Sequence, residues 1–248
     1  MIILKSQEEI KKMKKSCKFL SDVMKKVKES VRPGVSTAEL NEIAEKEIMD
    51  LGAKPAFKGY QGFPSALCTS INDEVVHGIP SKERILVSGD ILKLDCGLIY
   101  QEYYSDMAIS VPVGKVSEEA EKLMRVTEEA LKRGIRKAKA GNTLGEVGHA
   151  IQKHVEKNGF SVVRDMVGHG IGLNLHEDPQ IPNFGSKKSG ILLENGMTLA
   201  IEPMVNCGEY KIIFDSDGWT TRTKDGKLSA HFEHTIAITE NGTKILTD

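Results

Sequence analysis

The chain has 248 residues, of which 40% are hydrophobic and 28% are charged. Its 34 lysines and arginines nearly balance 35 aspartates and glutamates, so the net charge is −1. These values are typical of a soluble globular protein and exclude the disordered, collagen-like and membrane-embedded classes. The absence of a net positive charge also argues against nucleic acid as a specific partner.

The cysteines and the N-terminal segment indicate in which cellular compartment the protein is expected. Four cysteines are far apart and form no Cys-x-x-Cys pair, so neither a zinc knuckle nor a redox motif is predicted. The apolar run at residues 2–4 is shorter than the roughly 7–15 apolar residues of a signal peptide. No later stretch reaches the roughly 18 apolar residues that span a bilayer. We therefore expect reduced thiols in a cytoplasmic protein without a membrane partner.

Two amphipathic helices are predicted at the start of the chain. A Ser-x-x-Glu capping box at residues 6–9 precedes apolar residues at helical spacing, which stop at residues 32–34. A second capping box at residues 36–39 opens a helix that ends near Gly52. From Ser65 onward the pattern changes to short apolar runs broken by turn residues, which predicts strands. Their expected ranges are 66–71, 75–79, 91–98 and 103–113.

The same order of elements then repeats. Ser117 begins a predicted helix to about Ala140, and a capping box at residues 143–146 opens another to about Lys157, before a strand at 160–163. At a constant offset of 107, Gly34, Ser36, Glu39 and Leu40 match Gly141, Thr143, Glu146 and Val147. An internal duplication would leave this pattern. Helices followed by strands, twice, predict an α+β fold whose antiparallel sheet is covered on one face by helices. Because no linker separates the halves, we expect residues 1–248 to form a single domain.

The predicted hairpin at residues 91–113 carries one acid on each arm. If its turn is centred between Tyr100 and Gln101, Asp95 lies directly opposite Asp106, with Cβ atoms about 4.5–5.5 Å apart. Such a pair is destabilising unless a cation lies between the charges, and two divalent ions about 3.5–4 Å apart would suit the gap. The alternative is an exposed hairpin with two solvated acids. The apolar neighbours on both arms argue against that alternative.

A histidine and two further acids lie downstream. His169 stands between glycines that let the backbone approach a ligand closely, and His176 follows seven residues later. Glu202 lies in an apolar run 107 residues after Asp95, and Glu233 enters a run with strand alternation. Buried carboxylates are costly unless they are paired or bound to metal. Four such acids and a histidine therefore need a common explanation.

Five motifs occur together in this chain: Asn72–Pro80, Asp95 with Asp106, Gly168–Gly172 with His176, Ile201–Met204 and Phe232–Thr235. They resemble the motifs of the methionine aminopeptidases of the pita-bread fold, peptidase family M24A, and specifically of the short bacterial type I enzymes. The resemblance covers nearly the whole chain. It implies a curved antiparallel sheet, covered by two pairs of helices, with internal pseudo-twofold symmetry.

The resemblance implies a site for two divalent cations. Asp95 would chelate one ion, and His169 and Glu202 would chelate the other. Asp106 and Glu233 would bridge both. Because four carboxylates and one imidazole form a mostly hard, oxygen-rich set, manganese, iron(II), cobalt and zinc are all candidates.

The implied activity is removal of the initiator methionine from nascent proteins and peptides, with a small second residue preferred. A hydroxide bridging the two ions would attack the scissile carbonyl, while Glu202 takes and returns the proton. His77 and His176 would lie beside the substrate as catalytic hydrogen-bond donors to the tetrahedral intermediate. Association with ribosomes and a monomeric state are further expectations.

The resemblance also implies a pocket for the methionine side chain. Its lining would be Phe57, Tyr60, Phe63, Cys68 and Trp219. Aromatic rings suit a thioether, because sulfur–aromatic contacts contribute about 0.3–1.5 kcal/mol. Leu175 stands where some relatives carry an aromatic residue. His149, His154, His231 and His234 match no functional role and are expected to be structural.

Two alternatives remain. An aminopeptidase P or prolidase shares the fold and the ligand types, although those relatives usually carry an additional N-terminal domain. A pita-bread protein that has lost its metals and serves as a binding module is the second alternative. All five ligand positions are filled in this chain, which argues against the metal-free alternative.

Overall fold

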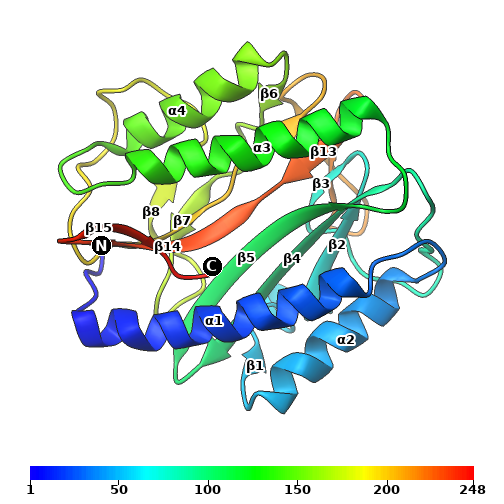
Figure 1. Cartoon of the computed structure of the whole chain (residues 1–248), viewed down its shortest axis with the longest axis horizontal. Coiled ribbons are helices and arrows are strands. Elements are labelled where there is room, and N and C mark those ends of the chain that lie inside the picture. The colour runs from blue at the N-terminus through cyan, green and yellow to red at the C-terminus, as the bar shows by residue number, and fades with distance from the viewer.

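Four helices cover one face of a curved sheet in the computed structural model, which describes residues 1–248 (Figure 1). The helices are α1 (Gln7–Glu29), α2 (Thr37–Asp50), α3 (Glu118–Lys137) and α4 (Leu144–Lys157). The pair α1 and α2 packs on strands of the first half of the chain, and α3 and α4 pack on strands of the second half. No helix combines the length and apolar character that a membrane span requires.

Each predicted helix begins where its capping residues stand. The Ser6 hydroxyl accepts the backbone N–H of Glu9, and the Glu9 carboxylate accepts the backbone N–H of Ser6. The same reciprocal pair forms between Ser36 and Glu39. One such cap contributes about 1 kcal/mol to helix stability. The four helices predicted from the sequence are therefore confirmed, with ends displaced by no more than a few residues.

The strands form one large sheet and two small ones, all of them antiparallel. The nine-stranded sheet has the order β1-β4-β5-β14-β9-β7-β8, with β2 also on β4 and β15 also on β14. The small sheets have the orders β13-β10-β6 and β11-β12-β3. The strands are β1 (Lys54–Pro55), β2 (Leu67–Ile71), β3 (Glu74–Val76), β4 (Ile91–Tyr100), β5 (Tyr103–Pro112), β6 (Ser161–Val162), β7 (Gly168–Gly170), β8 (Glu177–Ile181), β9 (Thr198–Ile201), β10 (Met204–Asn206), β11 (Ile212–Phe214), β12 (Thr221–Thr223), β13 (Ser229–His231), β14 (Glu233–Thr239) and β15 (Gly242–Ile245), with a short 3₁₀ helix at Tyr60–Gly62.

The pseudo-twofold symmetry expected from the sequence is present in the backbone hydrogen bonds. Gly34 donates its N–H to the carbonyl of Leu86, and Gly141 donates to the carbonyl of Leu193. Each residue of the second pair lies 107 positions after its counterpart. Isolated bridges repeat the same offset, namely Ser36 with Ile85 and Thr143 with Leu192. Gly34 and Gly141 have φ angles of 90° and 86°, a region that favours glycine, so the repeated glycines have a conformational cause.

The register of the β4–β5 hairpin differs from the expected one. Asp95 pairs with Ala108, and Asp106 pairs with Gly97, so the prediction that the two acids lie directly opposite each other is wrong. The turn residues are 101–102, with φ angles of 50° and 71°, one residue later than assumed. This moves the register by two residues. The acids therefore remain on one face of the sheet as a diagonal pair, which side chains can still bridge.

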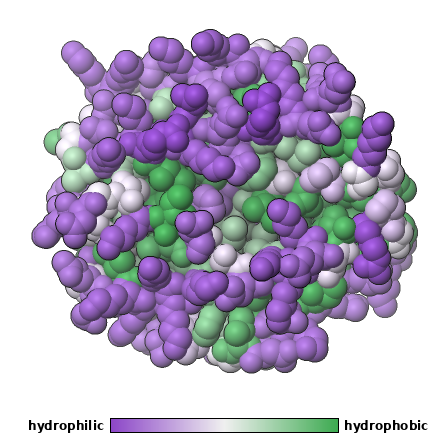
Figure 2. Space-filling model, viewed as in Figure 1, coloured by the Kyte–Doolittle hydropathy of each residue, from purple (hydrophilic) through white to green (hydrophobic).

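The helix surfaces that face solvent are largely hydrophilic, and apolar side chains gather between the two helix pairs (Figure 2). The buried apolar residues form two main clusters, one under each pair of helices. A third cluster contains Met13 and Cys17 of α1 together with Phe57, Phe63 and Cys68. This third cluster fixes the wall of the cavity described next.

Candidate metal centre

The five residues expected as metal ligands line one cavity of about 200 Å³. They come from five strands that are consecutive neighbours in the large sheet, β4, β5, β14, β9 and β7. In that order the residues are Asp95, Asp106, Glu233, Glu202, which follows the last residue of β9, and His169. The strand order thus brings together side chains that are far apart in the sequence.

His169 lies among the acids with one ring nitrogen directed at them. Its Nε2 is 3.8 Å from Asp106 Oδ2 and 3.6 Å from Glu202 Oε1. One ligand atom each from Asp106, His169 and Glu233 lie within 4.8 Å of one another. Nδ1 of His169 lies 2.9 Å from the carbonyl oxygen of Gly170. That contact places the ring proton on Nδ1, which leaves the Nε2 lone pair for a cation.

The charges of the cavity fit a divalent cation. Asp95 Oδ1 and Glu233 Oε1 are buried and have no hydrogen-bond partner. Burial raises the pKa of Asp95 to about 7 and that of Glu202 to about 8. Burial, followed by the negative charge of neighbouring acids, raises the pKa values of Asp106 and Glu233 well above their usual range. A hard divalent cation among these oxygens would supply the missing partners and offset the repulsion.

The glycines beside His169 have a steric cause. A Cβ at Gly168 would lie 2.4 Å from the carbonyl oxygen of Ala200, and one at Gly170 would lie 2.1 Å from that of Asp178. Only glycine therefore allows β7 to pass between β9 and β8 with His169 in the cavity. The glycine-rich motif in the sequence is explained by this close approach.

The other wall of the same cavity is apolar and aromatic. It contains all five residues expected to bind the methionine side chain, Phe57, Tyr60, Phe63, Cys68 and Trp219, together with Leu175 and Gln61. The rings of Phe63 and Trp219 pack edge to face with centroids 5.1 Å apart. Gln61 was not predicted, and its φ of 48° within the short 3₁₀ helix is not signalled by the local sequence.

His77 and His176 line this cavity and also a neighbouring outer cleft of about 620 Å³, which shares His169 and Glu202 with it. The Nδ1 atom of His176 is 2.7 Å from the hydroxyl of Tyr60. Burial lowers the pKa of His176 and lowers that of His77 to about 4, so both rings are neutral at pH 7. His77 has a φ of 60°, which is incompatible with a strand. β3 therefore ends at Val76, whereas the sequence predicted a strand to residue 79.

Comparisons with known proteins agree with this geometry. Residues 11–240 match metallopeptidase family M24. Over 247 residues the chain is 53% identical to the methionine aminopeptidase of Clostridium perfringens, which covers 100% of this chain and 99% of that protein. The chain belongs to the methionine aminopeptidase family. The predicted pita-bread fold and the predicted family, with its type I branch, are therefore confirmed.

Solved structures distinguish the expected family from the prolidase alternative. The methionine aminopeptidase of Thermotoga maritima is 48% identical and superposes with a TM-score of 0.98, covering 100% of both chains. The prolidase of Pyrococcus horikoshii is 27% identical with a TM-score of 0.81, and the match covers 64% of that chain. Both proteins share the fold, but the methionine aminopeptidase is the more similar in sequence, in superposition and in length.

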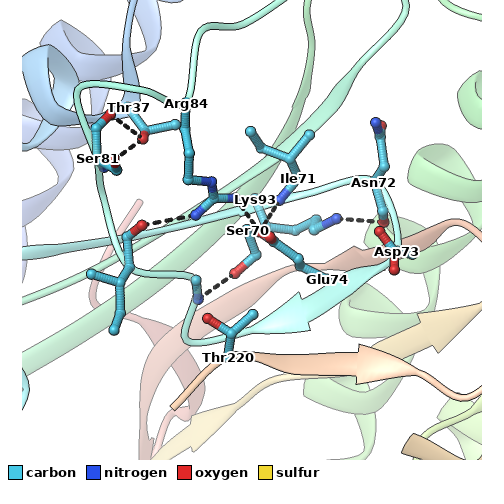
Figure 3. Close-up of polar contacts among 12 residues, drawn as sticks. Thr37, Ser70, Ile71, Asn72, Asp73, Glu74, Ser81, Arg84, Lys93 and Thr220 are labelled. Atoms are coloured by element: carbon cyan, nitrogen blue, oxygen red, sulfur yellow. Dashed lines mark hydrogen bonds and ion pairs between the residues drawn. The ribbon is translucent and has the colours of Figure 1, made fainter. Parts of the chain in front are cut away.

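A network of buried and half-buried charges, which the sequence did not predict, flanks the turn at His77, the His77 turn. Figure 3 shows its part around Asn72, Glu74, Arg84 and Lys93. Arg84 contacts the Glu74 carboxylate and donates to the carbonyl of Ile79 at 2.8 Å. Lys93 is 1% exposed and donates to the backbone carbonyl of Asn72 at 2.7 Å. Arg84 thus joins the segments before and after His77, and Lys93 anchors Asn72 to β4 of the large sheet.

Arg222 on β12 links the His77 turn to the loop that carries Trp219. Its guanidinium lies 3.1 Å from Asp73 Oδ1, 2.8 Å from Glu74 Oε1 and 2.6 Å from Asp215 Oδ2. The ring centroids of His77 and Trp219 are 6.3 Å apart. One guanidinium therefore connects two walls of the cavity.

Proposed function

We propose that the chain hydrolyses the peptide bond after an N-terminal methionine, in nascent polypeptides and free peptides, at the cavity described above. Metal-dependent removal of N-terminal methionine is the activity of its family. One observation carries the proposal for this site: a single cavity has four acids and an imidazole at one end and aromatic and sulfur side chains at the other. The first end suits divalent cations, and the second suits an unbranched thioether.

The chain binds divalent metal, and we propose two ions. Their ligands would be Asp95, Asp106, His169, Glu202 and Glu233. When bound, the ions supply Lewis-acid chemistry, because they polarise a carbonyl oxygen and lower the pKa of a water molecule. The donor set is compatible with manganese, iron(II), cobalt and zinc.

Glu202 is proposed as the group that moves the proton. It follows the last residue of β9, and Pro203 after it lacks an N–H and cannot continue the ladder. Its side chain lines both the inner cavity and the outer cleft. From there its carboxylate would take a proton from the attacking water and return it to the leaving amine.

His176 and His77 are proposed to stabilise the oxyanion. The Tyr60 hydroxyl lies 2.7 Å from Nδ1 of His176, and we assign the hydroxyl as the donor. The ring proton would then lie on Nε2, which is available as a donor to the oxyanion. A well-placed donor of this kind contributes about 2.7–4 kcal/mol to transition-state stability. The aromatic wall would hold the methionine side chain in register with these donors.

Two peptides test the proposal. With added Mn(II) or Co(II), the purified protein is expected to release free methionine from Met-Ala-Ser and nothing from Ala-Pro-Ala. Release of alanine from the second peptide, with the first left intact, would transfer the chain to the proline-specific branch of the fold.

We further propose that residues 1–248 act as one catalytic domain in the cytoplasm. The large sheet takes neighbouring strands from both halves of the chain, which supports one cooperative unit. The four cysteines are free thiols, as expected in a reducing compartment. Association with ribosomes is a separate proposal, which co-sedimentation with purified ribosomes tests.

A further inference from the structure

His231 on β13 was expected to be structural, yet its ring is directed at Glu202. The side chain is 1% exposed, and Nε2 lies 3.4 Å from Glu202 Oε2. Neither ring nitrogen has a hydrogen-bond partner. Because an unpartnered buried polar group costs about 1–3 kcal/mol, a purely structural role gives no reason to keep an imidazole at this position.

The backbone of His231 is held firmly in place. The Ser110 hydroxyl on β5 accepts the N–H of His231 at 2.9 Å and donates to its carbonyl at 2.8 Å. His231 is also paired with Met204 on β10, two residues after Glu202. The backbone thus places the ring beside the Glu202 carboxylate, and its nearly complete burial leaves it little room to turn away.

The two oxygens of Glu202 face different partners. Oε1 lies 3.6 Å from Nε2 of His169, on the side of the metal ligands, and Oε2 faces His231. The backbone carbonyl of Glu202 accepts the Nδ2–H of Asn183 at 3.0 Å. The main chain of Glu202 is thus fixed at its carbonyl. Because Nε2 of His169 carries no proton, His231 is the imidazole of the two that can donate to the carboxylate.

We propose that His231 is a positioning residue that donates its Nε2–H to Oε2 of Glu202 and so keeps Oε1 directed toward the metal ligands. A contact of 3.4 Å is long for a hydrogen bond, but such bonds at active sites often tighten only in the functional complex. The proposal rests on the proposed role of Glu202. It adds a residue to which the sequence assigned no function.

A matched pair of substitutions tests it. His231→Gln keeps an N–H at the position of Nε2, whereas the shorter His231→Asn keeps one only near the position of Nδ1. The Asn variant is expected to lose about 10- to 100-fold in kcat on Met-Ala-Ser with little change in KM, and the Gln variant to stay within about threefold. Equal losses in both variants, or a loss confined to KM, would overturn the proposal.

A second readout does not depend on activity. In the Co(II)-loaded protein, the visible absorption of the metal is expected to change in His231→Asn and to be retained in His231→Gln. Unchanged spectra in both variants would contradict the proposal. If the wild-type chain itself releases no methionine, the proposed function fails, while the spectra still report on His231.

The wild-type protein provides a third test in case the Asn variant does not fold. Long-range proton–nitrogen NMR spectra of the Zn(II)-loaded protein distinguish the two neutral tautomers of a histidine. The His231 signals, assigned by their loss in His231→Gln, are expected to report a proton on Nε2. A proton on Nδ1 would refute the proposed donation.

Discussion

The two halves of the chain repeat one backbone frame, but each holds its acid in the cavity in a different way. Asp95 and Glu202 are 107 residues apart and correspond to each other in the repeat. Asp95 lies inside β4, paired with Cys68 of β2 on one side and Ala108 of β5 on the other. Glu202 follows the end of β9, and Pro203 interrupts the ladder there.

This difference would let one duplicated position serve the two proposed roles, that of a cation ligand and that of a proton carrier. The backbone of Asp95 is fixed by ladders on both sides, which suits a ligand that only holds a cation. An acid just beyond the end of a strand lies outside the ladder, so the Glu202 carboxylate faces His169 with one oxygen and His231 with the other. This placement suits a group that also transfers a proton. The surroundings agree, because the side chain of Glu202 lines the outer cleft and that of Asp95 does not.

The largest expected effects come from neutralising these two acids. At saturating Mn(II), Glu202→Gln is expected to lower kcat by about 10²- to 10⁴-fold, because a general base is lost. Asp95→Asn is expected chiefly to raise the Mn(II) concentration needed for half-maximal activity. Steady-state kinetics across a metal titration separate the two effects. A kcat at saturating metal that falls more in Asp95→Asn than in Glu202→Gln would break the comparison.

A smaller loss of activity is expected from breaking the ion pairs by which Arg222, in the second half of the chain, contacts Asp73 in the first half. Arg222→Met removes the partner that Asp73 and Asp215 share and is expected to cost about 1–3 kcal/mol of folding free energy. Because the guanidinium connects the His77 turn to the Trp219 loop, KM for methionine peptides is expected to rise more than kcat falls. Kinetics and thermal unfolding measure both changes.

Lys211→Met provides the control for Arg222→Met. Lys211 is an exposed cation nearby whose only ion pair, with Glu209, is 3.9 Å long. Its removal is expected to change stability by less than about 1 kcal/mol and to leave KM unaltered. An equal rise of KM in both variants would mean that net charge, and not the position of the cavity walls, is responsible.

The smallest effect tests the repeat itself. Gly34→Ala and Gly141→Ala each place a side chain at a φ angle near 90°, with no atom within 4 Å of the new Cβ. Backbone strain alone should therefore destabilise each variant by about 1–2 kcal/mol. Denaturant unfolding measures the two losses, and activity is expected to persist. Losses that differ by more than about 1 kcal/mol would mean that the two frames are not energetically equivalent.

Much of this architecture could be predicted because local rules and the repeat agree. The capping boxes at Ser6 and Ser36 begin their helices as expected. The offset of 107 residues relates backbone hydrogen bonds, such as those of Gly34 and Gly141, as well as matching side chains. The five expected ligands share a cavity because each lies on or next to a strand of one sheet.

The remainder depends on features without a local signature. The turn at Gln101 and Glu102 has two positive φ angles but lacks the Asn-Gly or Asp-Gly pair that usually announces such a turn. The register predicted for the β4–β5 hairpin was therefore wrong by two residues. His231 and Arg222 contact residues far away in the sequence, so only the tertiary structure reveals what they touch.

Anomalous diffraction from crystals grown with Mn(II) tests the central claim most directly. The account predicts manganese peaks in the cavity, within bonding distance of side chains from all five strands. The expected ligands are Asp95, Asp106, His169, Glu202 and Glu233. Diffraction that shows no peak among these side chains in crystals of active enzyme would contradict the account.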